Sequence, residues 1–249
     1  MSTKATASWR WPLVEFALHP ALDLDAARAT FARDRRVQLA PFLSDASAAA
    51  LAEDLAVRED WTLVLNAGDK TFEIDRAGQA ALSEAQRAGL DARINAAARD
   101  GFQFRFESIR VPDDDDARAA LDTPLAAFTR FLSSESVRTA LRHVTDVRAI
   151  DFADAQATRY QAGDFLTGHD DDVAGKHRHA AYVLGLSPRW RTEWGGLLLF
   201  HDGSTVEGWA PQFNALSLFA VPQPHSVSIV TPFAGAPRVS VTGWLRSRA

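Results

Sequence analysis

The chain has 249 residues, enough for one large domain or two small ones, and its hydrophobic content of 47% and charged content of 24% are ordinary for a globular protein. A net charge of −5 argues against a general nucleic-acid binder, and the absence of cysteine excludes disulfides and thiolate metal sites. Because no run of 18 apolar residues and no signal-peptide pattern is present, we expect no membrane segment and a cytoplasmic location.

The first half of the chain is expected to combine helices with short strands. Trp9 and Trp11 are expected to pack on the domain. Asp23 or Asp25 suits the N-cap of a helix that runs to about Asp34, and Ser44 suits the N-cap of one over 45–57. The other predicted elements of this half are strands over 37–40, 61–66, 70–74 and 101–111, and helices over 84–99, 123–132 and 134–143.

Two features of this half have more than one interpretation. Phe102, Phe104 and Phe106 share one face of a predicted strand, which favours core packing, with a substrate-facing wall as the alternative. The acidic run 113–116 is interpreted as a solvated loop, with a lid or a second cation site as alternatives.

From Arg148 onward the pattern changes to short alternating segments separated by turns, which is typical of a jelly roll or barrel. The predicted strands are 148–160, 179–186, 195–201, 205–209, 213–220, 225–231 and 238–246. Gly195 and Gly196 allow a strand to begin close to another backbone. Trp194 beside them is either a core anchor or part of a substrate wall.

Candidate metal ligands follow the aromatic stretch that begins at Tyr160. In an extended segment His169 and Asp171 point to the same side, and His225 is the best candidate for a third ligand. Two histidines and one carboxylate form the facial triad of non-haem Fe(II) oxygenases. Asp170 and Asp172 are rivals to Asp171 and are expected to be exposed, or to orient a ligand.

Other polar residues receive weaker assignments. His177 and His179 are two residues apart and are interpreted as a polar rim, with a direct role in substrate binding as the alternative. His201 is expected to be a strand-end residue, and His19 and His143 to be structural or exposed.

Arg238 opens the last predicted strand, 13 residues after His225. An arginine inside a barrel is costly to bury without an anion, and its planar fork matches a carboxylate. Ser240 lies two residues on, on the same face, and could donate its hydroxyl to the same group. These residues predict a carboxylate site beside the metal site.

The order and spacing of these motifs resemble the 2-oxoglutarate- and Fe(II)-dependent dioxygenases, in particular their prolyl 4-hydroxylase-like branch, over roughly residues 150–246. The matching residues are Tyr160, Gly163, His169, Asp170, Asp171, Trp194, Gly195, Gly196, Leu197, Leu198, Pro211, Asn214, Phe219, His225, Ser226, Val227, Arg238, Val239, Ser240, Gly243 and Trp244. The resemblance implies an α+β fold with a double-stranded β-helix (jelly-roll) core over 148–249, and a supporting region over 1–147 whose helices pack on one sheet.

The resemblance also implies the reaction. His169, Asp171 and His225 would bind Fe(II), and 2-oxoglutarate would place its far carboxylate on Arg238. Tyr160 resembles the family's hydroxyl donor to this cosubstrate, with a satisfied strand tyrosine as the alternative. Where some relatives have another tyrosine, this chain has Gly185, so either Tyr182, or Ser240 with Thr242, is expected to take that role.

The function implied is hydroxylation of an unactivated C–H bond with release of succinate and CO2. The expected substrate is a prolyl or other peptidyl residue, with a small molecule as the alternative; dioxygen is required, and ascorbate is a further candidate cofactor. No nucleic-acid partner is expected. Two other classes stay open: a cupin-like metal-binding jelly roll, acting as an isomerase or ligand-binding protein without 2-oxoglutarate, and a non-catalytic barrel used for interaction.

Overall fold

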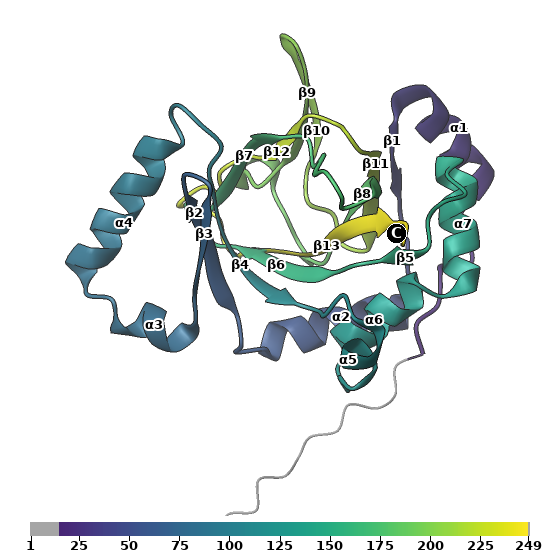
Figure 1. Cartoon of the computed structure of the whole chain (residues 1–249), viewed down its shortest axis with the longest axis horizontal. Helices are drawn as coiled ribbons and strands as arrows, with labels where there is room; N and C mark the ends of the chain where they lie inside the picture. Colours follow the sequence, from purple (N-terminus) through teal and green to yellow (C-terminus); the bar gives the residue numbers. More distant parts are fainter. Residues whose placement is uncertain (1–14, 249) are drawn as a thin grey trace, which may run out of the picture.

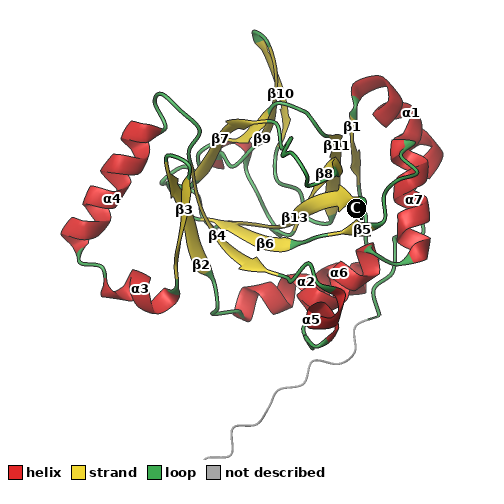
Figure 2. Cartoon of the chain, viewed as in Figure 1, coloured by secondary structure: helices red, strands yellow, loops and turns green. Residues whose placement is uncertain are grey.

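The computed structural model describes residues 15–248, and the predicted packing of Trp9 and Trp11 lies outside this range. Figure 1 shows a curled sheet in the middle of the molecule with helices around it, and Figure 2 colours the same view by secondary structure. The strands are β1 (Arg36–Leu39), β2 (Thr62–Ala67), β3 (Lys70–Ile74), β4 (Phe104–Arg110), β5 (Phe152–Ala153), β6 (Gln156–Tyr160), β7 (Phe165–His169), β8 (Arg178–Gly185), β9 (Leu198–Asp202), β10 (Thr205–Trp209), β11 (Ala215–Ala220), β12 (His225–Val227) and β13 (Arg238–Arg246). The helices are α1 (Leu24–Asp34), α2 (Asp45–Val57), α3 (Arg76–Ala81), α4 (Glu84–Ala97), α5 (Asp115–Ala119), α6 (Pro124–Leu132) and α7 (Glu135–Thr145), with a 3-10 turn η1 (Thr192–Trp194).

Short polar side chains begin the longer N-terminal helices at the predicted positions. Asp23 accepts the N–H of Ala26 at the start of α1, and Ser44 caps α2 over the predicted residues. Ser83 and Gln86 form a reciprocal capping box at the start of α4. These caps satisfy backbone donors that the first turn of a helix leaves free, which is why the sequence marks the starts so well.

Helices α3 and α5 are not among the predicted elements. Each is short, and each begins at an aspartate, Asp75 for α3 and Asp114 for α5. Asp114 belongs to the acidic run interpreted as a solvated loop, so that interpretation is wrong for the second half of the run. Asp113 pairs with Arg246 at 3.0 Å, and Asp115 pairs with Arg248 at 2.6 Å. The run is therefore tied to the last strand and its end.

Every strand pair in the described range is antiparallel. The strands follow the order β1-β11-β8-β13-β6-β4-β7-β12-β9-β10, with β2 beside β4, β3 beside β2 and β5 beside β13. The sheet curls on itself where β4 pairs with β7, through Phe104 opposite Leu166. Strand β7 is absent from the predicted strands, although the segment around His169 is expected to be extended. Because of this curl, the candidate metal ligands and Arg238 line one cavity on the inner face of the sheet.

Helices α1, α2, α6 and α7 pack on the outer face of one half of this sheet, as predicted, whereas α4 packs against β2 in a separate cluster. Leu51 of α2, Phe128 of α6 and Leu141 of α7 are buried in one cluster with Leu184 of β8 and Leu218 of β11. Burial of such a side chain contributes roughly 1.5–3 kcal/mol. Strands β1 and β4 also come from the first half of the chain and join the sheet itself. The boundary after residue 147 stays a prediction.

The turn at Gly195 and Gly196 brings two backbones together. Gly195 has a φ of +70°, and a Cβ there would lie 2.0 Å from the carbonyl oxygen of Ile229. The glycine is therefore required by both conformation and space. This turn precedes β9 and sets its distance from the segment after β12, through the bridge between Gly195 and Val230.

We expect Gly195→Ala to lower the free energy of unfolding by more than about 2 kcal/mol, because strain and a backbone clash add. Gly203→Ala is the matched control, since Gly203 has a φ of +58° but no atom within 4 Å of an added Cβ. It should lose only about 1 kcal/mol. Chemical denaturation of both variants measures the difference, and equal losses would show that the close approach to Ile229 has no energetic weight.

No helix between residues 15 and 248 is long and apolar enough to cross a membrane.

Candidate metal centre

Two histidines and an aspartate meet at the end of β7. His169 is the last residue of β7 and lies opposite His225, the first residue of β12. Nε2 of His169 lies 3.5 Å from Oδ1 of Asp171, and Nε2 of His225 lies 3.5 Å from Oδ2 of the same carboxylate. The candidate ligand atoms all lie within 4.8 Å of one another. The structure thus brings together the three residues proposed from the sequence, and their role as ligands stays a prediction.

Asp171 reaches this site by a different route from the one predicted. Strand β7 ends at His169, and Asp171 has a φ of +66° in the left-handed region, so strand alternation does not orient it. Asp170 is exposed, and its carboxylate accepts the N–H of Asp172. The turn therefore directs Asp171 inward and leaves the two rival aspartates outside the group of three.

Backbone carbonyls orient both imidazoles. Nδ1 of His169 lies 3.0 Å from the carbonyl oxygen of Thr167, and Nδ1 of His225 lies 2.7 Å from that of Gln223. A carbonyl only accepts, so each Nδ1 carries the proton and each Nε2 keeps its lone pair toward Asp171. Hydrogen bonds of this kind are typical of metal-binding histidines.

The charge states at neutral pH also suit a divalent cation. Burial lowers the pKa of His225 to about 4, so this imidazole is neutral and its Nε2 carries no proton that a metal would have to displace. Burial opposes ionisation of Asp171, but its contacts with the imidazoles of His169 and His225 hold its pKa below the ordinary value. Two neutral nitrogens and one carboxylate are a donor set for Fe(II), with protein ligands on one side only.

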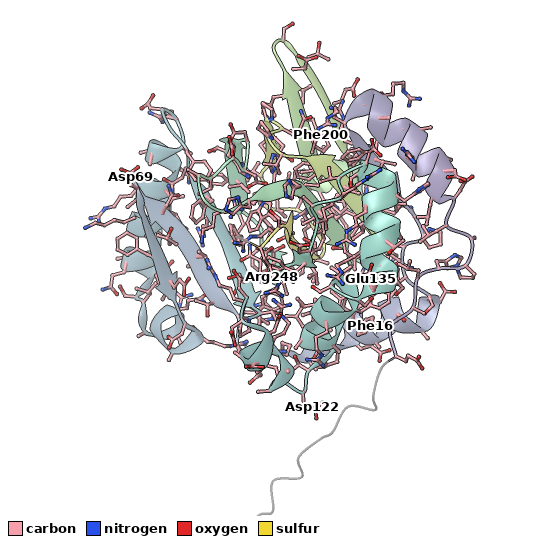
Figure 3. All side chains as sticks on the ribbon, turned by 45° about the vertical axis from the view of Figure 1, so that its right-hand side comes forward. Phe16, Asp69, Asp122, Glu135, Phe200 and Arg248 are labelled. Atoms are coloured by element: carbon pink, nitrogen blue, oxygen red, sulfur yellow. The ribbon has the colours of Figure 1, made fainter. Side chains whose placement is uncertain are left out.

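These side chains line a cavity of about 790 Å³ inside the curled sheet. Behind His225, the ring of Phe219 lies edge-on at 4.6 Å, and Phe200, labelled in Figure 3, packs edge-on against Phe219 at 5.2 Å. The apolar rings hold the imidazole plane and keep water from that side.

Arg238 lies in the wall of the same cavity. It is only 4% exposed, burial lowers its pKa, and its Nε has no hydrogen-bond partner. Among the described residues, no carboxylate lies within 4.0 Å of its guanidinium. An unpaired buried cation is costly, so the site fits an anion from outside the chain.

Ser240 contacts that guanidinium. Its Oγ is 3.4 Å from a terminal nitrogen of Arg238 and 2.9 Å from Oγ1 of Thr158. Thr158 belongs to the cavity wall, whereas the residues described there do not include Ser240. The expected hydroxyl donor therefore contacts Arg238 and Thr158, and its direct role toward a carboxylate stays a prediction.

The two tyrosines of the chain have different surroundings. Tyr160 lies in the cavity wall beside Arg238, whose guanidinium carbon is 5.1 Å from the ring centre. Burial raises the pKa of Tyr160, so its hydroxyl stays protonated and able to donate. The hydroxyl of Tyr182 donates to the carbonyl oxygen of Asp154 at 2.7 Å, deep in the core. The geometry thus favours Tyr160 and commits Tyr182 elsewhere.

Both interpretations of the aromatic strand β4 and its approach hold in part, because Phe106 is buried in a hydrophobic cluster against which Phe104 packs, while all three rings face the cavity. Phe102, Phe104 and Phe106 all line the cavity, and Phe102 is 49% exposed at its rim. Successive rings lie 5.5 Å and 5.6 Å apart, and Phe106 stacks on Tyr160 at 5.3 Å. Alternation correctly placed them on one face, but only the curl of the sheet makes that face a cavity wall.

Sequence reasoning missed several residues of the wall. His201, expected to be only a strand-end residue, lines the cavity, and its Nε2 lies 2.7 Å from Oγ of Ser226. Arg178 donates to the backbone carbonyl of Asp171 at 3.1 Å and lies over the ring of Trp244 at 3.5 Å. The adjacency of Ser226 to His225 and the alternation of β13 toward Trp244 were the only signals for these contacts.

Other candidates lie away from the centre. His179 contacts Oγ of Ser247 at 3.1 Å, and His177 is exposed. Neither is among the described residues of the cavity wall. Trp194 packs edge-on against Trp190 at 5.3 Å and against Gly235, so it anchors the turn before β9. His143 is paired with Asp25 on the surface.

Residues 155–246 match the family model of the 2OG-Fe(II) oxygenase superfamily. Over this segment the chain is similar to that superfamily. The matched range contains the whole triad and Arg238, which are the residues that carried the resemblance in the sequence. The superfamily implies Fe(II) and 2-oxoglutarate, and the donor set and the unpaired buried arginine fit these two groups.

Among known proteins, the chain is similar to prolyl hydroxylases. The chain is 28% identical to prolyl 3-hydroxylase OGFOD1 of Xenopus laevis over 172 residues. This match covers 66% of this chain and 32% of the Xenopus protein. The chain therefore spans about a third of the length of this curated relative.

Two solved oxygenase structures share the fold. A prolyl-4-hydroxylase of Pseudomonas putida superposes with a TM-score of 0.56 at 20% identity, covering 91% of this chain and all of the other. A prolyl hydroxylase of Trichoplax adhaerens, in complex with a peptide fragment of the hypoxia inducible factor oxygen degradation domain, gives 0.57 at 15% identity, covering 90% and 89%. The predicted jelly-roll fold with packed helices is confirmed.

Proposed function

We propose that this oxygenase hydroxylates a C–H bond of a prolyl or other peptidyl residue, using Fe(II), 2-oxoglutarate and dioxygen and releasing succinate and CO2. The observation that carries the proposal is one cavity that contains both a His-Asp-His group and a buried arginine without an acidic partner. A peptidyl substrate is supported by the prolyl hydroxylase relative and by the peptide complex of the Trichoplax protein. Cytoplasmic location stays a prediction, as does any use of ascorbate.

The chain's own residues have separable tasks. His169, Asp171 and His225 would hold the metal from one side, which leaves its other positions for ligands that react. When bound there, Fe(II) with 2-oxoglutarate and dioxygen supplies the oxidising power for hydroxylation. Arg238 would pair with the far carboxylate of 2-oxoglutarate, and Tyr160 would donate its hydroxyl to the same group. The aromatic wall of Phe102, Phe104 and Phe106 excludes water and gives the substrate an apolar surface.

The test is an anaerobic titration of the Fe(II)-loaded protein with 2-oxoglutarate, followed by the visible metal-to-ligand charge-transfer band of the chelate. A saturable band supports the cosubstrate site and leaves the substrate to be identified. Metal binding without a band would move the assignment to the cupin-like alternative, which needs the metal but has no use for Arg238.

The two tyrosines give a sharper prediction. Tyr160→Phe should weaken 2-oxoglutarate binding in that titration by about 1 kcal/mol, roughly fivefold, with little change in unfolding free energy. Tyr182→Phe should leave 2-oxoglutarate binding almost unchanged. It should lower the free energy of unfolding by about 1 kcal/mol, because the carbonyl of Asp154 loses its buried donor. Weaker cosubstrate binding in Tyr182→Phe alone would exchange the two assignments.

A further inference from the structure

A second cavity of about 420 Å³ lies beside the metal cavity. The two share a wall of five residues: Arg110, Gln156, Arg178, Thr242 and Trp244. Arg178 and Trp244 also flank Asp171, so the second cavity, which we call the side pocket, adjoins the metal end of the site. Arg110 is exposed at the edge of both cavities, so a ligand that lies across the mouth of one can extend into the other.

The side pocket is cationic in a chain whose net charge is −5. Its wall carries the basic side chains Arg110, Lys176, Arg178 and Arg246 and only two acids, Asp113 and Asp154. Both acids are engaged by the same partner: one guanidinium nitrogen of Arg246 lies 3.0 Å from Asp113 and 3.1 Å from Asp154. Burial also raises the pKa of Asp154.

The other three cations have weak or competing partners. Lys176 has no carboxylate within 4.0 Å in the described part of the chain. Arg110 lies 3.6 Å from Glu73, but both side chains are more than half exposed, and such pairs contribute little. Arg178 lies 3.9 Å from the carboxylate of Asp171, which a metal ion would claim for itself. The pocket therefore has positive charge available for a ligand.

We propose that the side pocket binds a carboxylate of the substrate, next to the residue that is hydroxylated. This rests on the proposed function and adds a substrate class to it: peptides with an acidic group beside the target. The nearby acidic run should repel such a ligand only weakly, because its carboxylates have partners. Asp113 pairs with Arg246, Asp114 caps α5 and Asp115 pairs with Arg248. Thr242 and Gln156 on the shared wall offer neutral hydrogen-bonding groups along the path from the metal.

The test uses the full chain, kept anaerobic with Fe(II) and 2-oxoglutarate. Calorimetry measures binding of N-acetylated, C-amidated pentapeptides with a central proline and glutamate, glutamine or lysine on either side. A second set, with proline next to a free C-terminus, separates a side-chain carboxylate from a terminal one. We expect the acidic peptides of at least one set to bind about fivefold to tenfold more tightly than their neutral counterparts.

Three charge reversals locate the effect. Arg110→Glu and Lys176→Glu should each abolish or reverse the preference for the acidic peptide. Arg189→Glu is the matched control, because Arg189 is exposed and is not part of the described wall of either cavity. Arg178 is left unchanged, since it holds the backbone of Asp171.

The charge-transfer band separates the two proposals. It should be the same in Lys176→Glu and Arg189→Glu, whose side chains are not part of the described wall of the metal cavity, and its absence there would count against the proposed function itself. With the band present, equal binding of acidic and neutral peptides would overturn the side-pocket proposal. A preference that persists in both Arg110→Glu and Lys176→Glu, or no binding of any peptide, would do the same.

Discussion

Asp171→Ala is expected to abolish iron-dependent turnover and the charge-transfer band with 2-oxoglutarate, while the fold survives. Asp171 supplies the only carboxylate among the described residues that lies within reach of both imidazoles. Without it, two neutral nitrogens remain, which hold a hard divalent cation poorly. Loss of a residue that only orients a metal ligand costs about ten- to a hundredfold, so loss of the ligand itself should exceed a hundredfold.

The neighbouring acids provide the controls. Asp170→Ala and Asp172→Ala change the same turn and the same charge, but both side chains are exposed. Each should retain the band and most of the activity. Circular dichroism and thermal unfolding establish that all three variants are folded. Persistent metal binding in Asp171→Ala, together with its loss in either neighbour, would reassign the ligand and the orientation of the whole turn.

How Asp171 reaches the site shows where sequence reasoning was sufficient and where it was not. The residue type and spacing pointed to the aspartate that lies beside the two histidines, but strand alternation was the wrong reason for it. The left-handed conformation at Asp171 is a property of the turn, and an aspartate, although enriched in that region, gives only a weak sequence signal for it. The order of the motifs therefore predicted the cluster better than local geometry did.

Local signals placed most elements of the fold. Helix caps such as Ser44 and Ser83 depend only on neighbouring residues, and β13 follows the alternation of its own sequence. Boundaries failed where distant residues intervene. The single strand predicted over 148–160 is divided into β5 and β6 at Asp154, whose side chain accepts the backbone N–H of Trp244. Such a contact between residues 90 positions apart leaves no periodic trace.

The walls of the site were harder to predict than its ligands. Phe102 and Phe104 carry the alternation of a core strand, and whether that face is filled or hollow depends on where β4 meets β7. The side pocket is similar, because it combines residues of β4, β6, β8 and β13 with the loop at Lys176. Sequence patterns describe faces of single elements, whereas cavities arise between several of them.

Substitution of Arg238 is the second change for which we expect a large effect. It should weaken the binding of 2-oxoglutarate, but it should stabilise the folded protein when 2-oxoglutarate is absent. With 2-oxoglutarate present, Arg238→Met removes a charge-assisted pair worth about 1.5–3 kcal/mol, so the cosubstrate should bind roughly ten- to 150-fold more weakly. Arg238→Lys keeps the charge but not the planar fork, and it should fall between Arg238→Met and the native chain. The anaerobic charge-transfer titration measures all three affinities.

Without 2-oxoglutarate the same substitution should stabilise the protein. The guanidinium of Arg238 is buried, its Nε has no partner, and no acid among residues 15–248 lies close enough to compensate it. An apolar side chain of similar length avoids that cost, so Arg238→Met should raise the free energy of unfolding by about 1–3 kcal/mol. Adding 2-oxoglutarate with Mn(II) should raise the Tm of the native chain and leave that of Arg238→Met almost unchanged, since only bound ligand stabilises the folded state. A less stable variant that still gains from 2-oxoglutarate would mean that Arg238 supports the sheet and that the carboxylate is held elsewhere.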